Sequence, residues 1–150
     1  MSAASRRWAA ACQEMNPRQG GGWAIVHKVT RHTVGMVTYF AVEAGQPPEI
    51  NYIVAAKWRR KGLGAEAVGA AVSHLFGEVG LEMLAADVAT DNIASINLLK
   101  GLGFSPVAAE DRIRTVGLDR LIATRWSLRA ETWHGAAQGH QATGRSSARA

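Results

Sequence analysis

The middle of the chain joins a strand pattern, a glycine-containing loop and a helix pattern in unbroken order. Residues 49–55, EINYIVA, are rich in strand-forming side chains, and residues 56–61 form a short loop. From Gly62 onward the apolar residues recur every three or four positions, as on a helix face: Val68, Val72, Leu75 and Val79. A helix that begins at Gly62 and Gly64 directs its first backbone N–H groups outward, at the positive end of its dipole. The junction therefore predicts an α/β fold with an anion-binding turn at its centre.

Strand and helix patterns flank this junction on both sides. The predicted elements are strands at 23–29, 34–42, 49–55 and 83–90, a helix ended by Gly77 and Gly80, a helix at 92–102, and strands at 104–109 and 119–128. The second helix places Ile93, Ile96, Leu99 and Leu102 on one stripe, and the polar residues 110–112 separate the last two strands. The order β-β-β-α-β-α-β-β predicts a mixed α/β sheet with a right-handed crossover at its centre.

A length of 150 residues corresponds to one small domain. We expect residues 1–22 to form a short helix over 4–15, which carries Trp8 and Met15, and then a flexible link or turn over residues 19–22. Residues 23–128 form the domain. Residues 129–150 are expected to be a disordered basic tail, because the segment 134–150 lacks large apolar side chains.

The net charge of +5 is unevenly distributed along the chain. Residues 1–22 and 129–150 each carry a net +2, and the core carries +1, with four basic residues clustered at 57–61. Dispersed arginines in two tails fall short of a nucleic-acid recognition motif, so nucleic acid is not the expected partner. No apolar run approaches the roughly 20 residues of a membrane span. A single cysteine, Cys12, and the lack of a secretory signal pattern predict a cytoplasmic protein.

Two common phosphate-binding loops do not match the junction. A Walker loop requires a Lys-Ser/Thr pair after its last glycine, whereas Ala65 and Glu66 follow Gly64. A dinucleotide fingerprint requires a third glycine, where this chain has Ala67, and a place on the first strand of a parallel sheet.

The junction instead resembles the acetyl-coenzyme A motif of the GNAT acetyltransferase superfamily, [Q/R]-x-x-G-x-[G/A], which reads here as residues 59–64, RRKGLG. Residues 92–104, NIASINLLKGLGF, resemble the second signature of the superfamily, N-x-x-[AS]-x-x-[LV]-x-x-K-x-G-F, except that Gly101 occupies the lysine position and Lys100 precedes it. One helix and one strand lie between the two motifs. Residues 49–52, EINY, look like the E-I-G-Y strand of the ribosomal-protein N-terminal acetyltransferase (Rim-type) branch. The resemblance covers residues 23–128 and implies a GNAT-like, mostly antiparallel sheet with a central β-α-β-α segment.

The resemblance implies acetyl-coenzyme A as co-substrate and assigns its binding residues. Backbone groups of Ile53 and Val54 would pair with the pantetheine arm as an added strand does. The pyrophosphate would lie on the loop and first helical turn: Arg59, Arg60, Lys61, Gly62, Leu63, Gly64 and Ala65. Asn92 would bind the pantetheine, although it is also a good helix N-cap, and Ser95 would either contact the co-substrate or cap the helix.

The implied reaction is direct attack of a primary amine, a protein N-terminus or a small amine, on the acetyl thioester in a ternary complex. Glu49 is the candidate base, acting through a water, and its alternative interpretation is a solvated charge at a strand end. The Val54 amide is the candidate oxyanion donor.

Two departures from the superfamily bear on this prediction. Many members have a tyrosine acid where this chain has Leu99. The usual first strand and helices, which form one wall of the acceptor site, are reduced or missing before Trp23. The alternative is therefore a non-catalytic remnant that binds coenzyme A or a partner without turnover. No metal is expected, because the five histidines and the cysteine lack ligand spacing, and a homodimer is left open.

Overall fold

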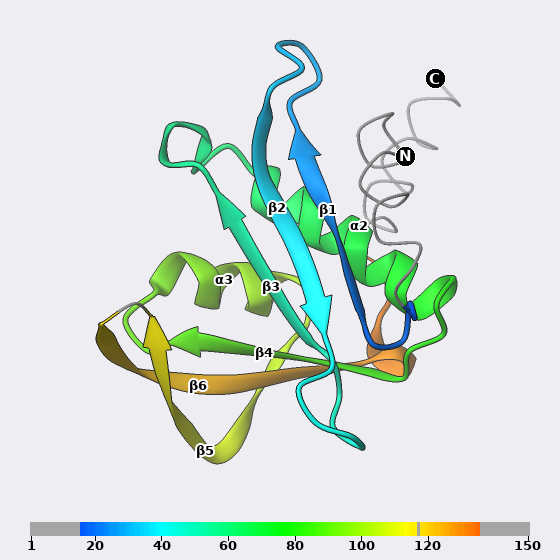
Figure 1. The fold of residues 1–150 in the computed structure, drawn as a ribbon, viewed down its shortest axis with the longest axis vertical. Coiled ribbons are helices and arrows are strands. Elements are labelled where there is room, and N and C mark those ends of the chain that lie inside the picture. Colours follow the sequence, from blue (N-terminus) through cyan, green and yellow to red (C-terminus); the bar gives the residue numbers. More distant parts are fainter. Residues whose placement is uncertain (1–15, 117, 136–150) are drawn as a thin grey trace, which may run out of the picture.

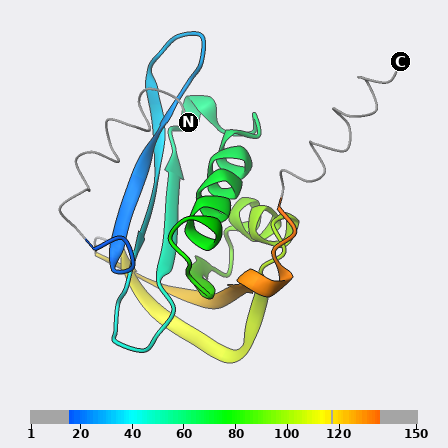
Figure 2. The same cartoon turned by 90° about the vertical axis from the view of Figure 1, so that its right-hand side faces the viewer.

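The computed structural model describes residues 16–116 and 118–135, which form one twisted sheet with its two α-helices on one face (Figures 1 and 2). The strand order is β1-β2-β3-β4-β6-β5. The elements are β1 Gly20–Val26, β2 Thr33–Phe40, β3 Glu49–Val54, η1 Ala56–Trp58, α2 Leu63–Gly77, β4 Met83–Ala89, α3 Ile93–Gly101, β5 Ser105–Val116, β6 Asp119–Arg129 and η2 Ala130–Thr132. The mixed α/β class and the element order expected from the sequence are confirmed. The predicted helix over 4–15 lies outside the described residues.

The first strand begins earlier than the sequence predicts. Gly20, Gly21 and Gly22 pair with β2 opposite Phe40, Tyr39 and Thr38, so the flexible link expected there is wrong. The glycines suit a strand because an added Cβ at Gly21 would lie 3.0 Å from the Tyr39 ring. The Tyr39 hydroxyl in turn donates a hydrogen bond to the Pro17 carbonyl at 2.8 Å, which ties the entry of the chain to the sheet.

The sheet divides between β3 and β4, its only parallel pair among the described strands. These strands pair in register at a single position, Glu49 opposite Ala85, with the Ala85 amide donating to the Pro48 carbonyl at 2.9 Å. Beyond this point β3 and β4 diverge (Figure 1). The side of β3 that faces β4 therefore has no strand partner over most of its length.

The core lies between the helices and the sheet. The predicted stripe of α2 is confirmed at Val68, Val72 and Leu75, which are all fully buried. The predicted apolar stripe of α3 is buried at Leu99 and at Leu102, which follows the helix, but Ile93 is 61% exposed. The expectation for Ile93 is wrong: this first residue of α3 directs its side chain to solvent.

Two boundaries near the C-terminus also differ from expectation. β5 continues through residues 110–112, and Asp111 and Arg112 pair with Thr124 and Ala123 of β6. The domain extends past residue 128, since Arg129 completes β6 and Trp133 packs on Phe76 and donates to Ser73 Oγ at 3.3 Å. Residues 136–150, most of the expected tail, lie outside the described residues.

The close approach of β2 to β3 depends on Gly35. A Cβ at this position would overlap the Ile53 carbonyl oxygen and lie 3.1 Å from Val54 Cα. We expect Gly35→Ala to lower the free energy of unfolding by about 2–3 kcal/mol. The matched control is Gly77→Ala, where nothing lies within 4 Å of the new methyl group and stability should stay level or rise slightly. Urea denaturation measures both; equal stabilities for the two variants would contradict the assignment.

Candidate active site

The loop between β3 and α2 has a backbone shaped for an anion. Arg60 and Gly62 both have positive φ, 61° and 76°, so the loop turns sharply before the helix begins. The Arg59 side chain stabilises this turn by donating from Nε to the Val54 carbonyl at 2.9 Å. Arg59 therefore orders the loop from the strand side, at the position that the motif assigns to it.

The first turn of α2 lacks an N-terminal side-chain cap. Gly62 occupies the N-cap position and has no side chain that could cap the helix. The first hydrogen bond of the helix runs from the Glu66 amide to the Gly62 carbonyl at 3.1 Å. The amides of residues 63–65 consequently have no partner within the helix. Uncapped amides at the positive end of a 15-residue helix fit a phosphate or pyrophosphate group.

The basic side chains beside this turn are exposed and add positive charge. Lys57 and Lys61 place their Nζ atoms 5.9 Å and 5.0 Å from the Trp58 ring centroid. His27, which follows β1, packs against the Trp58 ring, and the centroids of the two rings are 4.4 Å apart. Trp58 thus holds the two lysines near the loop, where they complement an anionic ligand.

Gly64 has a packing role that the sequence did not indicate. A Cβ there would lie 3.2 Å from Leu98 Cδ1 and 3.6 Å from Val54 Cγ2. The glycine lets α2 approach both α3 and the end of β3. This contact holds the amide-bearing turn beside the Val54 end of β3, where β3 and β4 lie apart (Figure 1).

The end of β3 directs a backbone donor into the gap between β3 and β4. The Ala55 amide donates to the Val34 carbonyl of β2 at 2.8 Å. Because successive residues of an antiparallel ladder point their backbone groups to opposite sides, the Val54 amide faces away from β2, towards β4. The neighbouring Ile53 side chain is 58% exposed on the face of the sheet that the described helices leave open.

At the start of α3, Asn92 is the helix N-cap. Its side-chain oxygen accepts a hydrogen bond from the Ser95 amide at 3.1 Å. The geometry supports the capping interpretation for Asn92, which remains exposed, while the Ser95 side chain faces Tyr52 of β3. A contact of either residue with pantetheine stays a prediction.

Glu49 lies in a buried cluster of four charged side chains on the open face of the sheet. Its Oε1 accepts from Arg125 Nη2 at 2.7 Å and Nη1 at 3.1 Å, and its Oε2 accepts from Arg114. Arg114 also donates from Nε to Asp87 Oδ2 at 2.8 Å. Glu49 is 2% exposed, so its interpretation as a solvated strand-end charge is wrong.

The partners of Glu49 were not identified from the sequence. Asp87, Arg114 and Arg125 come from β4, β5 and β6, so the cluster joins four strands on both sides of the gap. Asp87 interrupts a buried apolar strand, MLAADVA, and an isolated acid in such a strand requires a basic partner. That signal could have predicted an ion pair, although not which arginines supply it.

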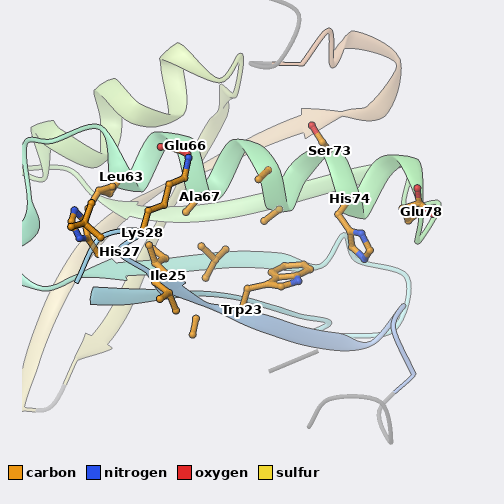
Figure 3. Close-up of a pocket in the computed structure, with 16 residues that line it drawn as sticks. Trp23, Ile25, His27, Lys28, Leu63, Glu66, Ala67, Ser73, His74 and Glu78 are labelled. Atoms are coloured by element: carbon orange, nitrogen blue, oxygen red, sulfur yellow. The ribbon is translucent and has the colours of Figure 1, made fainter. Parts of the chain in front are cut away.

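A separate cavity of about 810 Å³ lies between β1 and α2 (Figure 3). Apolar and aromatic side chains dominate its lining: Trp23, Ile25, Val37, Ala67 and His74. His74 packs edge-on against Trp23 with ring centroids 5.5 Å apart. The cavity lies on the helix-covered side of the sheet, apart from the charge cluster.

Other candidate chemistry is limited within residues 16–116 and 118–135. Leu99 is fully buried and offers no proton donor. No group of three or more His, Cys, Asp or Glu side chains in this part of the chain could hold a metal ion. None of its helices is long and apolar enough to cross a membrane.

A family model and a curated relative match the sequence of this chain. An acetyltransferase (GNAT) domain model matches residues 2–105. The uncharacterized N-acetyltransferase YoaA of Bacillus subtilis is 33% identical over 88 residues, which are 58% of this chain and 50% of YoaA, so the chain spans about half the length of this relative.

Solved structures share the fold at low sequence identity. The ribosomal-protein-S5-alanine acetyltransferase of Vibrio fischeri superposes with a TM-score of 0.73 at 17% identity, covering 85% of this chain and 71% of that one. A spermidine N-acetyltransferase of Vibrio cholerae gives a TM-score of 0.69 at 13% identity, covering 86% and 75%. With the domain model matching more than half of its residues, the chain belongs to the GNAT acetyltransferase family.

Proposed function

We propose that this protein transfers an acetyl group from acetyl-coenzyme A to a primary amine. The observation that carries the proposal is the first turn of α2, which lacks a side-chain cap and has basic side chains beside it. This turn follows β3, which separates from β4 after Glu49. The family supports the same chemistry, with acetyl-coenzyme A as co-substrate. We place the reaction in the cytoplasm and favour a protein N-terminal amine as acceptor.

Different residues bind the pyrophosphate and the pantetheine arm of acetyl-coenzyme A. The amides of residues 60–65, with Arg59 ordering the loop, hold the pyrophosphate, and Val54, Asn92 and Ser95 hold the pantetheine arm in the gap between β3 and β4. The backbone of Ile53, which the resemblance also assigns to pantetheine, faces β2 instead, so that part of the prediction is wrong. The thioester supplies the acetyl group, and the Val54 amide donates to its carbonyl oxygen as negative charge develops there. The acceptor amine approaches from the open face of the sheet.

Glu49 is the proposed base for the ammonium proton, through a water. Both of its oxygens accept hydrogen bonds from arginines, so a water reaches Oε2 only when Arg114 turns outward. Arg114 is suited to this because its side chain is 39% exposed, against 8% for Arg125. Arg125 would then hold the carboxylate in place while Arg114 leaves.

Two measurements test the function. Acetyl-coenzyme A should raise the melting temperature of the full chain, and unchanged melting would contradict the binding site. Release of free thiol is then followed with an alanine-initiated peptide and with spermidine as acceptors. Stabilisation without thiol release from any amine would favour the alternative, a remnant that binds coenzyme A without turnover.

Glu49→Gln tests the base. We expect kcat to fall about a hundredfold while the Kd for acetyl-coenzyme A stays unchanged, because the amide keeps an acceptor oxygen but takes no proton. Asp87→Asn is the matched control, since it neutralises the other acid of the same cluster. An equal loss in both variants would attribute the effect to the cluster and remove Glu49 as the base.

A further inference from the structure

Tyr52 places a buried polar group beside the gap in the sheet. Its side chain is half-buried on the helix-facing side of β3, between Ile50 and Val54, and packs against the core. Its hydroxyl group is buried and lies near the Ser95 side chain, but no hydrogen bond of good geometry joins it to any residue in the described part of the chain. A buried hydroxyl without a partner costs about 1–3 kcal/mol, so its presence requires a reason other than packing.

The position of Tyr52 connects this hydroxyl to the proposed co-substrate site. Tyr52 lies three residues past Glu49, where β3 and β4 have separated, and two residues before Val54. Its polar neighbour is Ser95 on α3, a residue assigned to the same site. Strand β3 and helix α3 therefore both bring a hydroxyl to the pantetheine end of the gap.

We propose that Tyr52 is the general acid that protonates the departing thiolate of coenzyme A. The inference rests on the proposed function. It supplies a proton donor for the thiolate, which Leu99 cannot be because it is an apolar side chain in the core. The amine nitrogen bonds to the acetyl carbon, the carbon–sulfur bond breaks, and its electron pair stays on sulfur. Sulfur takes the phenolic proton, and the phenolate recovers a proton from solvent after the products leave.

The surroundings of Tyr52 keep the acid in its protonated form. Burial raises the pKa of Tyr52 above its ordinary value of 10.0, and the Ser95 hydroxyl opposes this only in part. The group therefore carries its proton throughout the neutral range.

Tyr52→Phe tests the proposal, because it removes one oxygen and keeps the ring. We expect kcat to fall about a hundredfold with the KM for acetyl-coenzyme A unchanged, and the melting temperature to stay level or rise. Tyr39→Phe is the matched control: it removes the hydroxyl of the only other tyrosine in the chain, which donates to Pro17, and should leave kcat unchanged. Wild-type kcat in Tyr52→Phe would overturn the proposal.

A binding measurement separates this inference from the proposed function. Calorimetry compares coenzyme A with desulfo-coenzyme A, which lacks the thiol, on the wild type and on Tyr52→Phe. We expect the wild type to bind coenzyme A several-fold more tightly than the desulfo compound, and the variant to lose that preference. A preference of equal size in both proteins would overturn the role of Tyr52. Failure of the wild type to release thiol from acetyl-coenzyme A would contradict the proposed function, and the binding comparison would still decide whether Tyr52 faces the sulfur.

Discussion

Replacing Arg125 by methionine is expected to lower the free energy of unfolding by about 3–5 kcal/mol. Arg125 is 8% exposed and donates two hydrogen bonds to Glu49, and it also lies 3.5 Å from Asp87 Oδ1. Methionine fills a similar volume but leaves two buried carboxylates with only the half-exposed Arg114 to neutralise them. Uncompensated buried charge, rather than lost packing, then sets the size of the effect.

Urea denaturation of the variant and two controls measures this effect. Arg129→Met makes the same substitution at an exposed position of the same strand and should change stability by less than about 0.5 kcal/mol. Arg125→Met combined with Glu49→Gln should recover part of the loss, because the double variant buries one charge fewer. A loss below about 1 kcal/mol in Arg125→Met would show that the cluster contributes little to the fold.

Gly62→Asp is expected to weaken binding of acetyl-coenzyme A by about 10- to 100-fold. The substitution places a carboxylate at the N-cap of α2, next to the amides proposed to hold the pyrophosphate. Repulsion between these negative charges near a protein surface amounts to a few kcal/mol, and each 1.4 kcal/mol is a factor of ten in Kd. Isothermal titration calorimetry at fixed ionic strength measures the change.

Two controls separate charge from backbone strain. Gly62→Asn has the same shape without the charge and tolerates a positive φ, so it should retain most of the affinity. Gly45→Asp introduces the same residue at another positive-φ glycine with nothing within 4 Å, in the connection between β2 and β3, and should bind like the wild type. Equal weakening by Asp and Asn at position 62 would contradict an anion site there.

The sequence predicts most of the fold because local patterns determine most of its elements. The spacing of Val68, Val72 and Leu75 indicates α2, and its buried stripe follows from that spacing. The errors occur where tertiary contacts outweigh local preference. Local preference at 20–22 favours a link, but these glycines pair with β2. Local preference at 110–112 favours a break, but Asp111 and Arg112 pair with β6.

Of the candidate site, only the anion-binding backbone turn before α2 was predictable from the sequence. Glycines and basic residues at 57–64 carry a local signal for an anion-binding turn, and Gly62 does occupy the N-cap position. The partners of Glu49 come from 65 and 76 residues further along the chain, so no local pattern reveals them. The unpartnered hydroxyl of Tyr52 is likewise a product of packing against α3, which the sequence does not describe.

The separation of β3 from β4 has a consequence for the speed of binding. A ligand that inserts between paired strands must first break their ladder, and such an opening step slows association. Here the strands are already apart beyond Glu49, while the ion pairs among Glu49, Asp87 and Arg125 hold the closed end of the gap together. The backbone donors of β3 that face the gap then have no strand partner, and a ligand strand can pair with them without an opening step.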